Sequence, residues 1–561
     1  MKAVKIFICF MVFTLSGVML FAGGGQQAPV TGSIDTSVYS SLVTPPGQFP
    51  IVNSPAAMRV FTVQTAGIED FTTNDFTISY EQKTGVHINW ELAPATQGSQ
   101  MFNLSLASGD YPDVYMAMFV SKEDEILYGS QGVFIPLNKL IETYSPNTVQ
   151  QLADFPEIKA MVTTPDGNMY SLPYIAQTYH MYFPFKLWMN TTWLNNLNLK
   201  TPSTTEEFYQ TLKAFKERDP NGNGSGKNVI PFFDTDPFRD QVNRIGPTSF
   251  VTFFINSFIQ CDYDFRYVTD DNKIVFAFDK PEFREGLRYV RKLVSEGLID
   301  EASFSALPEQ LRRVADSDGD LILGATVQRA PSAFMNMNGD KQKNYDSVPP
   351  LAGPNGVRFA VYNPEASFTS GQFIITKSMK NPEIACRWVD YFYTWEGGLE
   401  ARYGREGQEW ERAKPGEITN GGQPALWRPL TALAGVQNVC WRTNIGQYYP
   451  QDKQMSNPDI YAPDGLEARL YAATRDNYVP YAPKKYIPQL YMTSDVLKKI
   501  NQPSIDMRNY VAECIVRFCT GDLSLDKDWD SYVSNLSKMG IPDILAASQA
   551  AYDSFLKNQN N

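Results

Sequence analysis

Four stretches decide the fold of this chain: VFTVQT at 60–65, NDFTISYEQKTG at 74–85, VHINWEL at 86–92 and PDVYM at 112–116. In the first and third, side chains alternate between two faces, which is typical of strands. The second places apolar side chains on one face and ends at a glycine, which predicts a helix. Another helix, ending at Gly109, precedes the fourth stretch. The order strand, helix, strand, helix, strand predicts a parallel sheet covered by helices.

Farther along the chain the pattern becomes more helical. Ser203 and Glu206 fit a capping box just after Pro202, and apolar residues follow at helical spacing from Phe208. GQFIIT at 371–376 has the apolar run of a buried strand. Because single cores stop growing beyond about 250 to 300 residues, a chain of 561 residues with 43% hydrophobic side chains predicts more than one lobe.

The N-terminal region differs in composition from the rest. Lys2 and Lys5 precede an apolar stretch that ends at Ala22, so residues 1–22 predict a secretory signal peptide. Position 23 is Gly where a lipoprotein has its lipid-bearing Cys, and we expect no lipobox. Residues 23–57, rich in Gly, Pro, Ser and Thr, predict a flexible leader. We therefore expect a soluble, periplasmic or extracytoplasmic protein.

Charge and residue counts argue against several classes of function. With 49 Lys and Arg against 61 Asp and Glu, we expect no nucleic-acid partner. His87 and His180 are the only histidines, which removes most His-dependent catalysis. A glycosidase with a pair of catalytic carboxylates stays an open alternative, although no spacing in the sequence favours a particular pair. Five cysteines lie outside the signal and show no metal-site spacing, so we expect buried free thiols: Cys261, Cys386, Cys440, Cys514 and Cys519.

A series of short motifs resembles one known family, the extracellular solute-binding proteins, family 1, of ABC importers. The likeness is to their larger lipoprotein-like and alginate-binding-like branch, and it spans nearly all of 58–556. Each motif alone is weak, but their order along the chain carries the resemblance. They are EQKTGV at 81–86, LASGDYPDV at 106–114, GNMYSLP at 167–173, EGLID at 296–300, YGREG at 403–407 and DWDSY at 528–532.

The resemblance implies a type 2 periplasmic-binding-protein fold, an α/β architecture with mixed sheets flanked by helices and hinge crossovers between two lobes. We expect the first lobe to comprise 58–172 plus about 365–425, and the second 173–364 plus about 426–556. The first crossover is expected near 170–174 and the return near 370–375. A ligand in the cleft would shift a mostly open population toward the closed form.

The resemblance also implies a function without chemistry. We expect a monomer that captures a carbohydrate, in particular an oligosaccharide, and delivers it to a membrane ABC permease, with no required cofactor. Two alternatives stay open, a secreted carbohydrate-active enzyme and a ligand-sensing receptor on the same fold. Whether the sugar is neutral or anionic is also open.

Aromatic side chains are the first candidates for ligand contact, because a ring can cover the C–H face of a sugar. Most aromatics must be core, but several lie near the expected crossovers or in the Gly- and Pro-rich stretch 397–450. Asp110 joins them as an acceptor for a hydroxyl, although turn chemistry explains it equally well. The aromatic candidates, each weighed against ordinary packing, are Tyr174, Trp188, Trp395, Trp410, Trp427 and Trp441.

A second candidate is the loop DPNGNGSGKN at 219–228. Asp219, Asn221, Asn223 and the carbonyl of Ser225 match the opening ligands of an EF-hand, and glycine stands at position six. The alginate-binding branch carries a calcium loop that resembles it. Here Lys227 and Asn228 replace acidic ligands of that branch, so weak Ca²⁺ binding competes with a metal-free turn.

Overall fold

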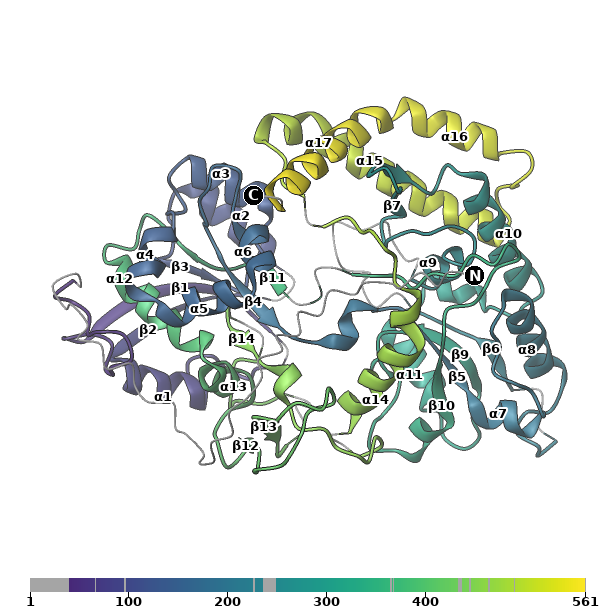
Figure 1. Ribbon diagram of the computed structural model, residues 1–561, viewed down its shortest axis with the longest axis horizontal. Coiled ribbons are helices and arrows are strands. Elements are labelled where there is room, and N and C mark those ends of the chain that lie inside the picture. The colour runs from purple at the N-terminus through teal and green to yellow at the C-terminus, as the bar shows by residue number, and fades with distance from the viewer. Residues whose placement is uncertain are drawn as a thin grey trace, which may run out of the picture. The chain divides into compact units, whose positions relative to one another are not determined.

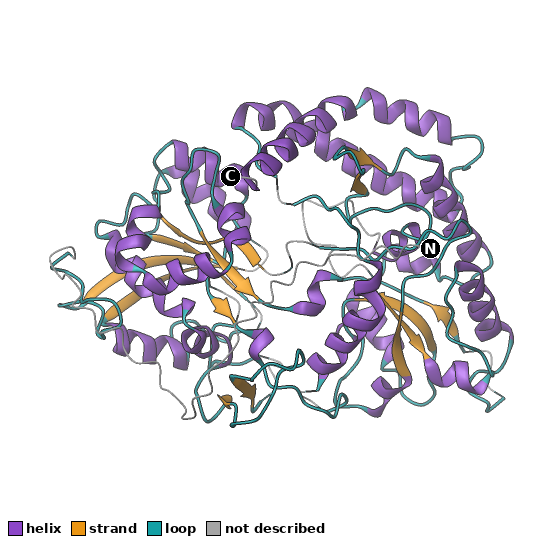
Figure 2. Cartoon of the chain, in the orientation of Figure 1, coloured by secondary structure: helices purple, strands orange, loops and turns teal. Residues whose placement is uncertain are grey.

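The computed structural model describes residues 40–559, except 66, 95–96, 225–227, 236–248, 364–365, 367, 432–435, 443–444, 463–464 and 489. The expected signal peptide, 1–22, and the first part of the leader lie outside the described residues. Helices and strands alternate along much of the chain and form two separate main sheets, each with helices around it (Figure 1; Figure 2).

The first sheet contains the strands that the opening stretches predict. Its order is β14-β4-β11-β3-β1-β2, and β1 pairs in parallel with both β2 and β3, so the predicted parallel arrangement is confirmed. The strand β11 runs antiparallel to β3 and β4, which makes the sheet mixed. The bounds are β1 (Ala56–Gln64), β2 (Val86–Pro94), β3 (Val114–Met116), β4 (Leu172–Ala176), β11 (Phe368–Ile375) and β14 (Tyr448–Tyr449).

Helices around the first sheet begin and end where local chemistry dictates. Asn74 caps α1 by accepting the backbone N–H of Phe76, and Gly85 ends it in the left-handed conformation. The core beneath the sheet includes Trp388 and Trp441, both fully buried. The helices are α1 (Asp75–Thr84), α2 (Gly98–Ser108), α3 (Lys122–Ser130), α4 (Asn138–Tyr144), α5 (Pro146–Asp154), α6 (Pro156–Val162), α12 (Pro382–Asp390) and α13 (Trp395–Tyr403).

The second sheet has the order β10-β5-β9-β6, where β9 pairs in parallel with β6 and antiparallel with β5. Its strands are β5 (Lys186–Asn190), β6 (Ile230–Phe232), β9 (Leu323–Gln328) and β10 (Tyr345–Val348). Helices and hairpins beyond the strands are α7 (Thr191–Asn196), α8 (Thr205–Glu217), α9 (Ser249–Ile255), β7 (Arg266–Val268) with β8 (Ile274–Phe276), α10 (Pro281–Ser295), α11 (Pro308–Ala315), α14 (Leu466–Ala473), α15 (Ser494–Thr520), α16 (Trp529–Lys538) and α17 (Ile541–Gln559).

The predicted helix at 203–215 is present as α8, but its capping box lies one residue farther along. Thr204 accepts the backbone N–H of Glu207, and the Glu207 carboxylate accepts the backbone N–H of Thr204 in return. Ser203 donates its hydroxyl to the same carboxylate. Three consecutive hydroxyl residues make the exact capping position ambiguous in the sequence.

Two expected boundaries need correction. Residues 40–57 of the expected flexible leader are folded: Val43 bridges to Val52, Ile51 is buried, and the buried Arg387 guanidinium donates to carbonyls of this segment. Proline and glycine prevent a regular element here, but a buried arginine can still satisfy irregular backbone. The strand β14, which lies in the part of the chain expected in the second lobe, pairs with β4 of the six-stranded sheet.

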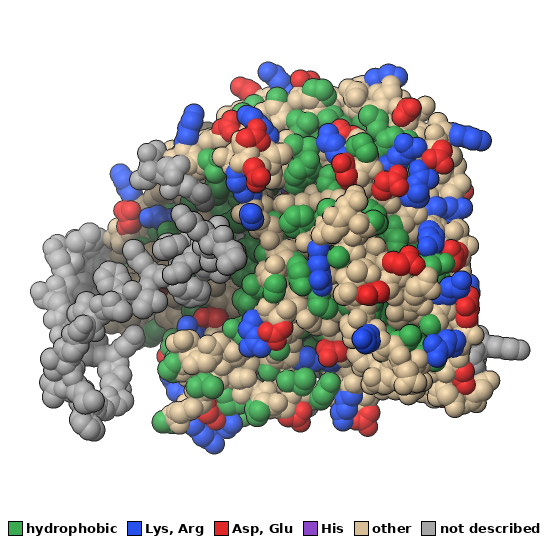
Figure 3. All heavy atoms as spheres, turned by 45° about the vertical axis from the view of Figure 1, so that its right-hand side comes forward, with side chains coloured by type: hydrophobic (Ala, Val, Ile, Leu, Met, Phe, Trp, Pro, Cys, Tyr) green, Lys and Arg blue, Asp and Glu red, His purple; other side chains and the backbone are tan. Residues whose placement is uncertain are grey.

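The five cysteines are all free and buried, which confirms the expectation of buried thiols. On the face drawn in Figure 3, Lys and Arg side chains are interspersed with Asp and Glu, and neither sign gathers into a stripe on the part of this face that is described. No helix among the described residues is both long and apolar enough to span a bilayer.

Candidate functional site

Three connections between the two main sheets lie side by side. The first crossover, 177–185, joins β4 to β5, the second, 349–367, joins β10 to β11, and the third leads from β14 toward α14 and α15. The backbone N–H of Asn363 donates to Tyr182 O at 2.9 Å, and that of Ala360 donates to Tyr481 O at 2.8 Å. Segments far apart in the sequence are therefore hydrogen-bonded to one another, and their side chains come together.

Each crossover contributes one tyrosine to a row of rings, which we call the tyrosine row: Tyr182, Tyr362 and Tyr486. The rings of Tyr182 and Tyr362 stack with centroids 5.9 Å apart and planes 11° apart. Tyr486 approaches Tyr362 at 5.2 Å and a plane angle of 56°, and its residue is 42% exposed. Tyr182 and Tyr362 are half-buried and pack against the core around the second sheet, so Tyr486 is the most exposed ring of the row.

A pocket lies beside the tyrosine row. Tyr362 and Tyr486 line it, and the remaining lining combines rings with charged and amide groups: Gln260, Cys261, Asp262, Tyr263, Arg266, Tyr267, Pro483, Lys485 and Ile487. Burial raises the pKa of Tyr486, and so does the carboxylate of Glu157, which belongs to α6 beside the first sheet. The pocket encloses only about 20 Å³, so in this structure it has room for a water molecule or one hydroxyl group and not for a sugar ring.

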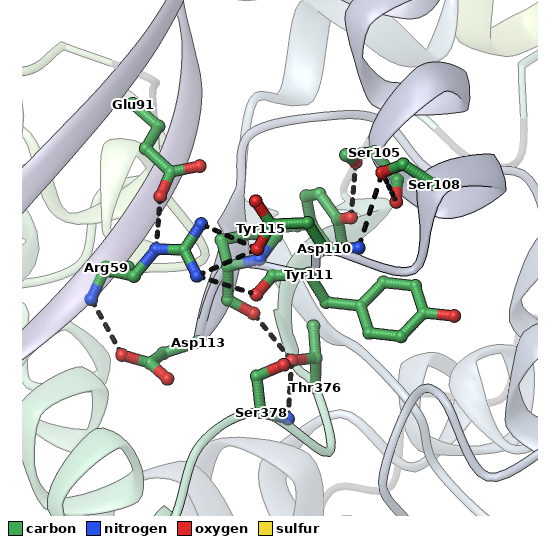
Figure 4. Close-up of polar contacts among 11 residues, drawn as sticks. Arg59, Glu91, Ser105, Ser108, Asp110, Tyr111, Asp113, Tyr115, Thr376 and Ser378 are labelled. Carbon is green, nitrogen blue, oxygen red and sulfur yellow. Dashed lines mark hydrogen bonds and ion pairs between the residues drawn. The ribbon is translucent and has the colours of Figure 1, made fainter.

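Another pocket, of about 470 Å³, lies at the edge of the first sheet where β1 begins and β11 ends. Asp113, Ser378 and Lys380 contribute to it, but no aromatic side chain does. The Asp113 carboxylate is already an acceptor for the backbone N–H of Arg59 at 2.8 Å (Figure 4). This pocket is much larger than the one beside the tyrosine row, but it offers no ring to cover a sugar face.

A second cluster surrounds Arg402 of α13. Its Nη1 donates to the Tyr174 hydroxyl at 3.1 Å, and its Cζ lies 4.1 Å from the centroid of the Tyr449 ring. The hydroxyls of Tyr403 and Tyr449 are 3.2 Å apart. Among the described residues, Arg402 Nε has no hydrogen-bond partner. The cluster holds a cation among phenols, which suits binding to hydroxyl groups.

The first crossover continues this polar region. His180 Nδ1 lies 3.1 Å from the Glu467 carboxylate of α14, and the rings of Tyr179 and Tyr471 are 4.7 Å apart. Burial opposes ionisation of Glu467, but His180, Gln451 and Arg402 together outweigh it and lower the pKa of the carboxyl. A carboxylate, phenols and a guanidinium side by side can exchange hydrogen bonds with a polyhydroxyl ligand.

The structure brings four of the predicted site residues together: Tyr174, Trp395, Trp410 and Trp427 share one cluster with Tyr449. Trp410 and Trp427 are fully buried, and their indole N–H groups donate to Gly404 O and Pro450 O at 2.9 and 2.8 Å. Trp395 is half-buried, with the Arg412 guanidinium 4.7 Å from its ring. The two buried indoles therefore pack beneath the other side chains of the cluster.

The other predicted residues lie apart from it. Trp188 is buried in β5 and donates to Gln328 O at 2.9 Å, and Trp441 is buried under the first sheet and donates to Thr77 at 2.7 Å. Asp110 pairs with Arg59 at 3.1 Å in an exposed turn (Figure 4). The side chains of Trp188, Trp441 and Asp110 therefore all bind groups of the protein itself. The irregular sequence around the tryptophans does not mean exposure, because irregular segments also fill cores.

Sequence reasoning missed the tyrosine row. Its signal was available in YVPYAPKKYIPQLY at 478–491, where tyrosines recur among prolines with neither a strand nor a helix period. Within this stretch Tyr478 is fully buried whereas Tyr486 is 42% exposed, so the pattern marks the segment but not which ring is accessible. The pair Tyr179 and Tyr182 in the first crossover carries the same signal.

Asp219, Asn221 and Asn223 in the 219–228 loop form hydrogen bonds within the protein. The Asp219 carboxylate accepts backbone N–H groups of Gly222 and Gly224 at 3.1 and 2.6 Å. Asn221 Oδ1 accepts the Trp193 indole N–H at 2.9 Å, and Asn223 Nδ2 donates to Asp320 at 2.6 Å. Ser225 lies outside the described residues. Across the described parts of the chain, no three His, Cys, Asp or Glu side chains gather as metal ligands.

Comparison with known proteins agrees with this architecture. The model of the family described as "Bacterial extracellular solute-binding protein" matches residues 62–398, more than half of the chain. A fructooligosaccharide ABC transporter substrate-binding protein, FusA of Streptococcus pneumoniae serotype 4, is 30% identical over 503 residues, which is 86% of this chain and 87% of FusA.

Solved structures give the same fold. FusA in complex with kestose has a TM-score of 0.73 and 27% identity, covering 90% of this chain and all of FusA's. A solute-binding protein from Bifidobacterium longum infantis, described as binding HMO, has a TM-score of 0.74 at 20% identity, covering 90% of this chain and 99% of that one. The predicted type 2 solute-binding fold is thereby confirmed, and the chain belongs to the bacterial extracellular solute-binding proteins.

Proposed function

We propose that this protein captures an oligosaccharide outside the cytoplasm, delivers it to an ABC permease and releases it chemically unchanged. Fructooligosaccharides are the first class to consider, because FusA is named for them and matches most of the chain. The HMO-binding relative shares the fold alone. Export by the signal peptide 1–22 and a monomeric state belong to the same proposal.

The tyrosine row is the observation that carries this proposal. Three rings from three crossovers form one aromatic group, in which Tyr486 is exposed, and a pocket with amide, carboxylate and ammonium groups adjoins them. Sugar rings are amphipathic, with C–H faces and hydroxyl edges, and such a lining matches both.

We further propose two lobes hinged at the three crossovers. The first would contain the six-stranded sheet, 56–176 with 368–449, and the second the four-stranded sheet with α14 to α17. A ligand that touches both lobes would favour the closed form only by the contacts it gains there. The backbone hydrogen bonds between crossovers support a hinge in which the three segments move together.

Isothermal titration calorimetry with kestose and nystose tests the proposal, with maltotriose, xylotriose and a tripeptide as comparison ligands. We expect saturable binding to at least one saccharide. Binding of the peptide without any saccharide would overturn the ligand class. Chromatography of kestose after prolonged incubation should recover it intact, and released fructose would instead favour the secreted enzyme.

A further inference from the structure

The loop 117–121, between β3 and α3, lies at the edge of the first sheet from which the first crossover departs. The strands β3 and β4 are both antiparallel to β11, so they run in the same direction. Their carboxyl ends therefore share one edge, and β4 leads from that edge into the crossover. In open α/β sheets, ligands bind outside the carboxyl ends of the strands.

The backbone of this loop is held in an unfavourable conformation. Ala117 and Phe119 have φ values of 54° and 52°, in the left-handed region that residues other than glycine rarely adopt. Two hydrogen bonds to β11 maintain it: Ala117 N donates to Gln372 O at 2.7 Å, and Val120 N to Gly371 O at 3.2 Å. A side chain at position 371 would meet Val120 O at 2.3 Å, so glycine is required there.

This backbone turns the ring of Phe119 outward. Phe119 is 64% exposed, whereas its neighbours Ala117 and Val120 are both 4% exposed. A single exposed phenylalanine is ordinary on a protein surface. A phenylalanine held outward at a strained position is not, because glycine or asparagine would fit this backbone with less strain.

The loop also adjoins the segment that carries part of the tyrosine row. Lys122 begins α3 directly after the loop, and its Nζ lies 5.0 Å from the centroid of the Tyr491 ring. The Tyr491 hydroxyl in turn donates to Met161 O of α6 at 2.5 Å. Tyr491 and Tyr486 belong to the same extended stretch before α15. The loop that carries Phe119 therefore leads directly into a helix whose first residue contacts the tyrosine-bearing segment.

We propose that Phe119 is the first-lobe platform for the ligand, against which the C–H face of a sugar ring stacks, opposite the tyrosine row. This inference rests on the proposed function, since it assigns one wall of the same saccharide site. It also gives the strained backbone a role, because the strain orients the ring before the ligand arrives.

The test is the affinity of Phe119 variants for kestose, nystose, maltotriose and xylotriose, measured by isothermal titration calorimetry beside the native protein. Phe119→Ala should raise the dissociation constant for the saccharide roughly ten-fold or more, because the sugar loses its stacking contact with one ring face. Phe119→Tyr should retain most of the affinity. Ile78→Ala, an equally simple truncation of an exposed residue in α1 (46% exposed), should bind as the native protein does.

A measurement on the unmodified protein complements the variants. Hydroxyl-radical footprinting should show less oxidation of Phe119 when the saccharide is bound and unchanged oxidation of Phe49, which is 40% exposed at the folded N-terminal segment. If the native protein binds a saccharide but Phe119→Ala binds it equally well, the inference is overturned and the proposed function stands. If the native protein binds no saccharide, both this inference and the proposed function are overturned.

Discussion

The rings of Tyr182 and Tyr362 stack at 5.9 Å although they belong to different crossovers. Tyr362 also contacts Phe183 at 5.4 Å and Tyr486 at 5.2 Å, so it occupies the centre of the aromatic group. The position of the tyrosine row is thus fixed by the segments that join the two sheets. Any rotation at the crossovers would move the rings together with the backbone.

Tyr362→Ala should weaken saccharide binding roughly ten-fold, because aromatic contacts contribute about 0.5 to 1.5 kcal/mol beyond burial and a ligand-facing ring is lost. Titration calorimetry measures the change. Tyr362→Phe keeps the ring and should lose much less affinity. Equal losses in both variants would show that the hydroxyl, and not ring stacking, provides the contact.

Tyr491→Phe should loosen the contact between the two sheet-bearing halves. Its hydroxyl donates to Met161 O, and a net hydrogen bond contributes about 0.5 to 1.5 kcal/mol. For the Tyr491→Phe variant we expect a larger radius of gyration in small-angle scattering without ligand. We also expect its dissociation constant for the saccharide to rise roughly two- to ten-fold.

Tyr510→Phe provides the matched control for Tyr491→Phe. The Tyr510 hydroxyl accepts from Asn535 Nδ2 at 3.1 Å, between two helices that both follow the third crossover. Its removal should leave scattering and affinity unchanged. The same response in both variants would mean that losing any helix-associated hydroxyl has this effect, and would contradict a special role for Tyr491.

The sequence predicted the elements whose signal is local. Alternation and glycine stops located β1, α1, β2 and β3, and the apolar run at 371–376 located β11. It did not predict which rings line a surface, because that depends on where three distant segments meet. Trp427 illustrates the limit: its surroundings look irregular, yet its indole donates to Pro450 O in a fully buried cluster.

The division of the chain into lobes shows the same limit. The two residues of β14 join the first sheet only by pairing with β4, and a strand this short leaves almost no pattern. The folded segment 40–57 depends on Arg387, more than 300 positions away, whose guanidinium binds its carbonyls. Both features are long-range, so local sequence reasoning placed them incorrectly.

Asn221→Ala should destabilise the protein by about 1 to 3 kcal/mol, because the Trp193 indole N–H and Leu321 O would lose their partner. Thermal melting measures the loss. Asn195→Ala, at an exposed helical position nearby, should change stability little. Addition of CaCl₂ or EDTA should not shift the melting temperature of the native protein, since Asp219 is the only carboxylate in the 219–228 loop. A rise in the melting temperature on addition of calcium would instead indicate that the 219–228 loop binds the metal.

Lys186 predicts a pH dependence of stability. The side chain is fully buried, donates to His180 O at 2.7 Å and to Phe183 O, and has no carboxylate partner within 4 Å among the described residues. Burial lowers its pKa from 10.5 to about 7, partly offset by Glu467. Between these values the unfolded chain binds a proton that the folded chain does not. The free energy of unfolding should therefore rise with pH across this window, by about 1.4 kcal/mol per unit for this group.

Urea unfolding at pH 7, 8 and 9 measures that slope in the native protein, Lys186→Met and Lys213→Met. Tyrosines and cysteines titrate in all three, so only the difference between slopes reports on the lysine. Lys186→Met should lose the rise, whereas Lys213→Met, exposed on α8, should keep it. Below pH 7 the folded and unfolded states both carry the proton, and the contribution of Lys186 should flatten. Identical slopes in all three proteins would mean that Lys186 keeps its charge in the folded state, with its ammonium stabilised by the two carbonyls at the first crossover.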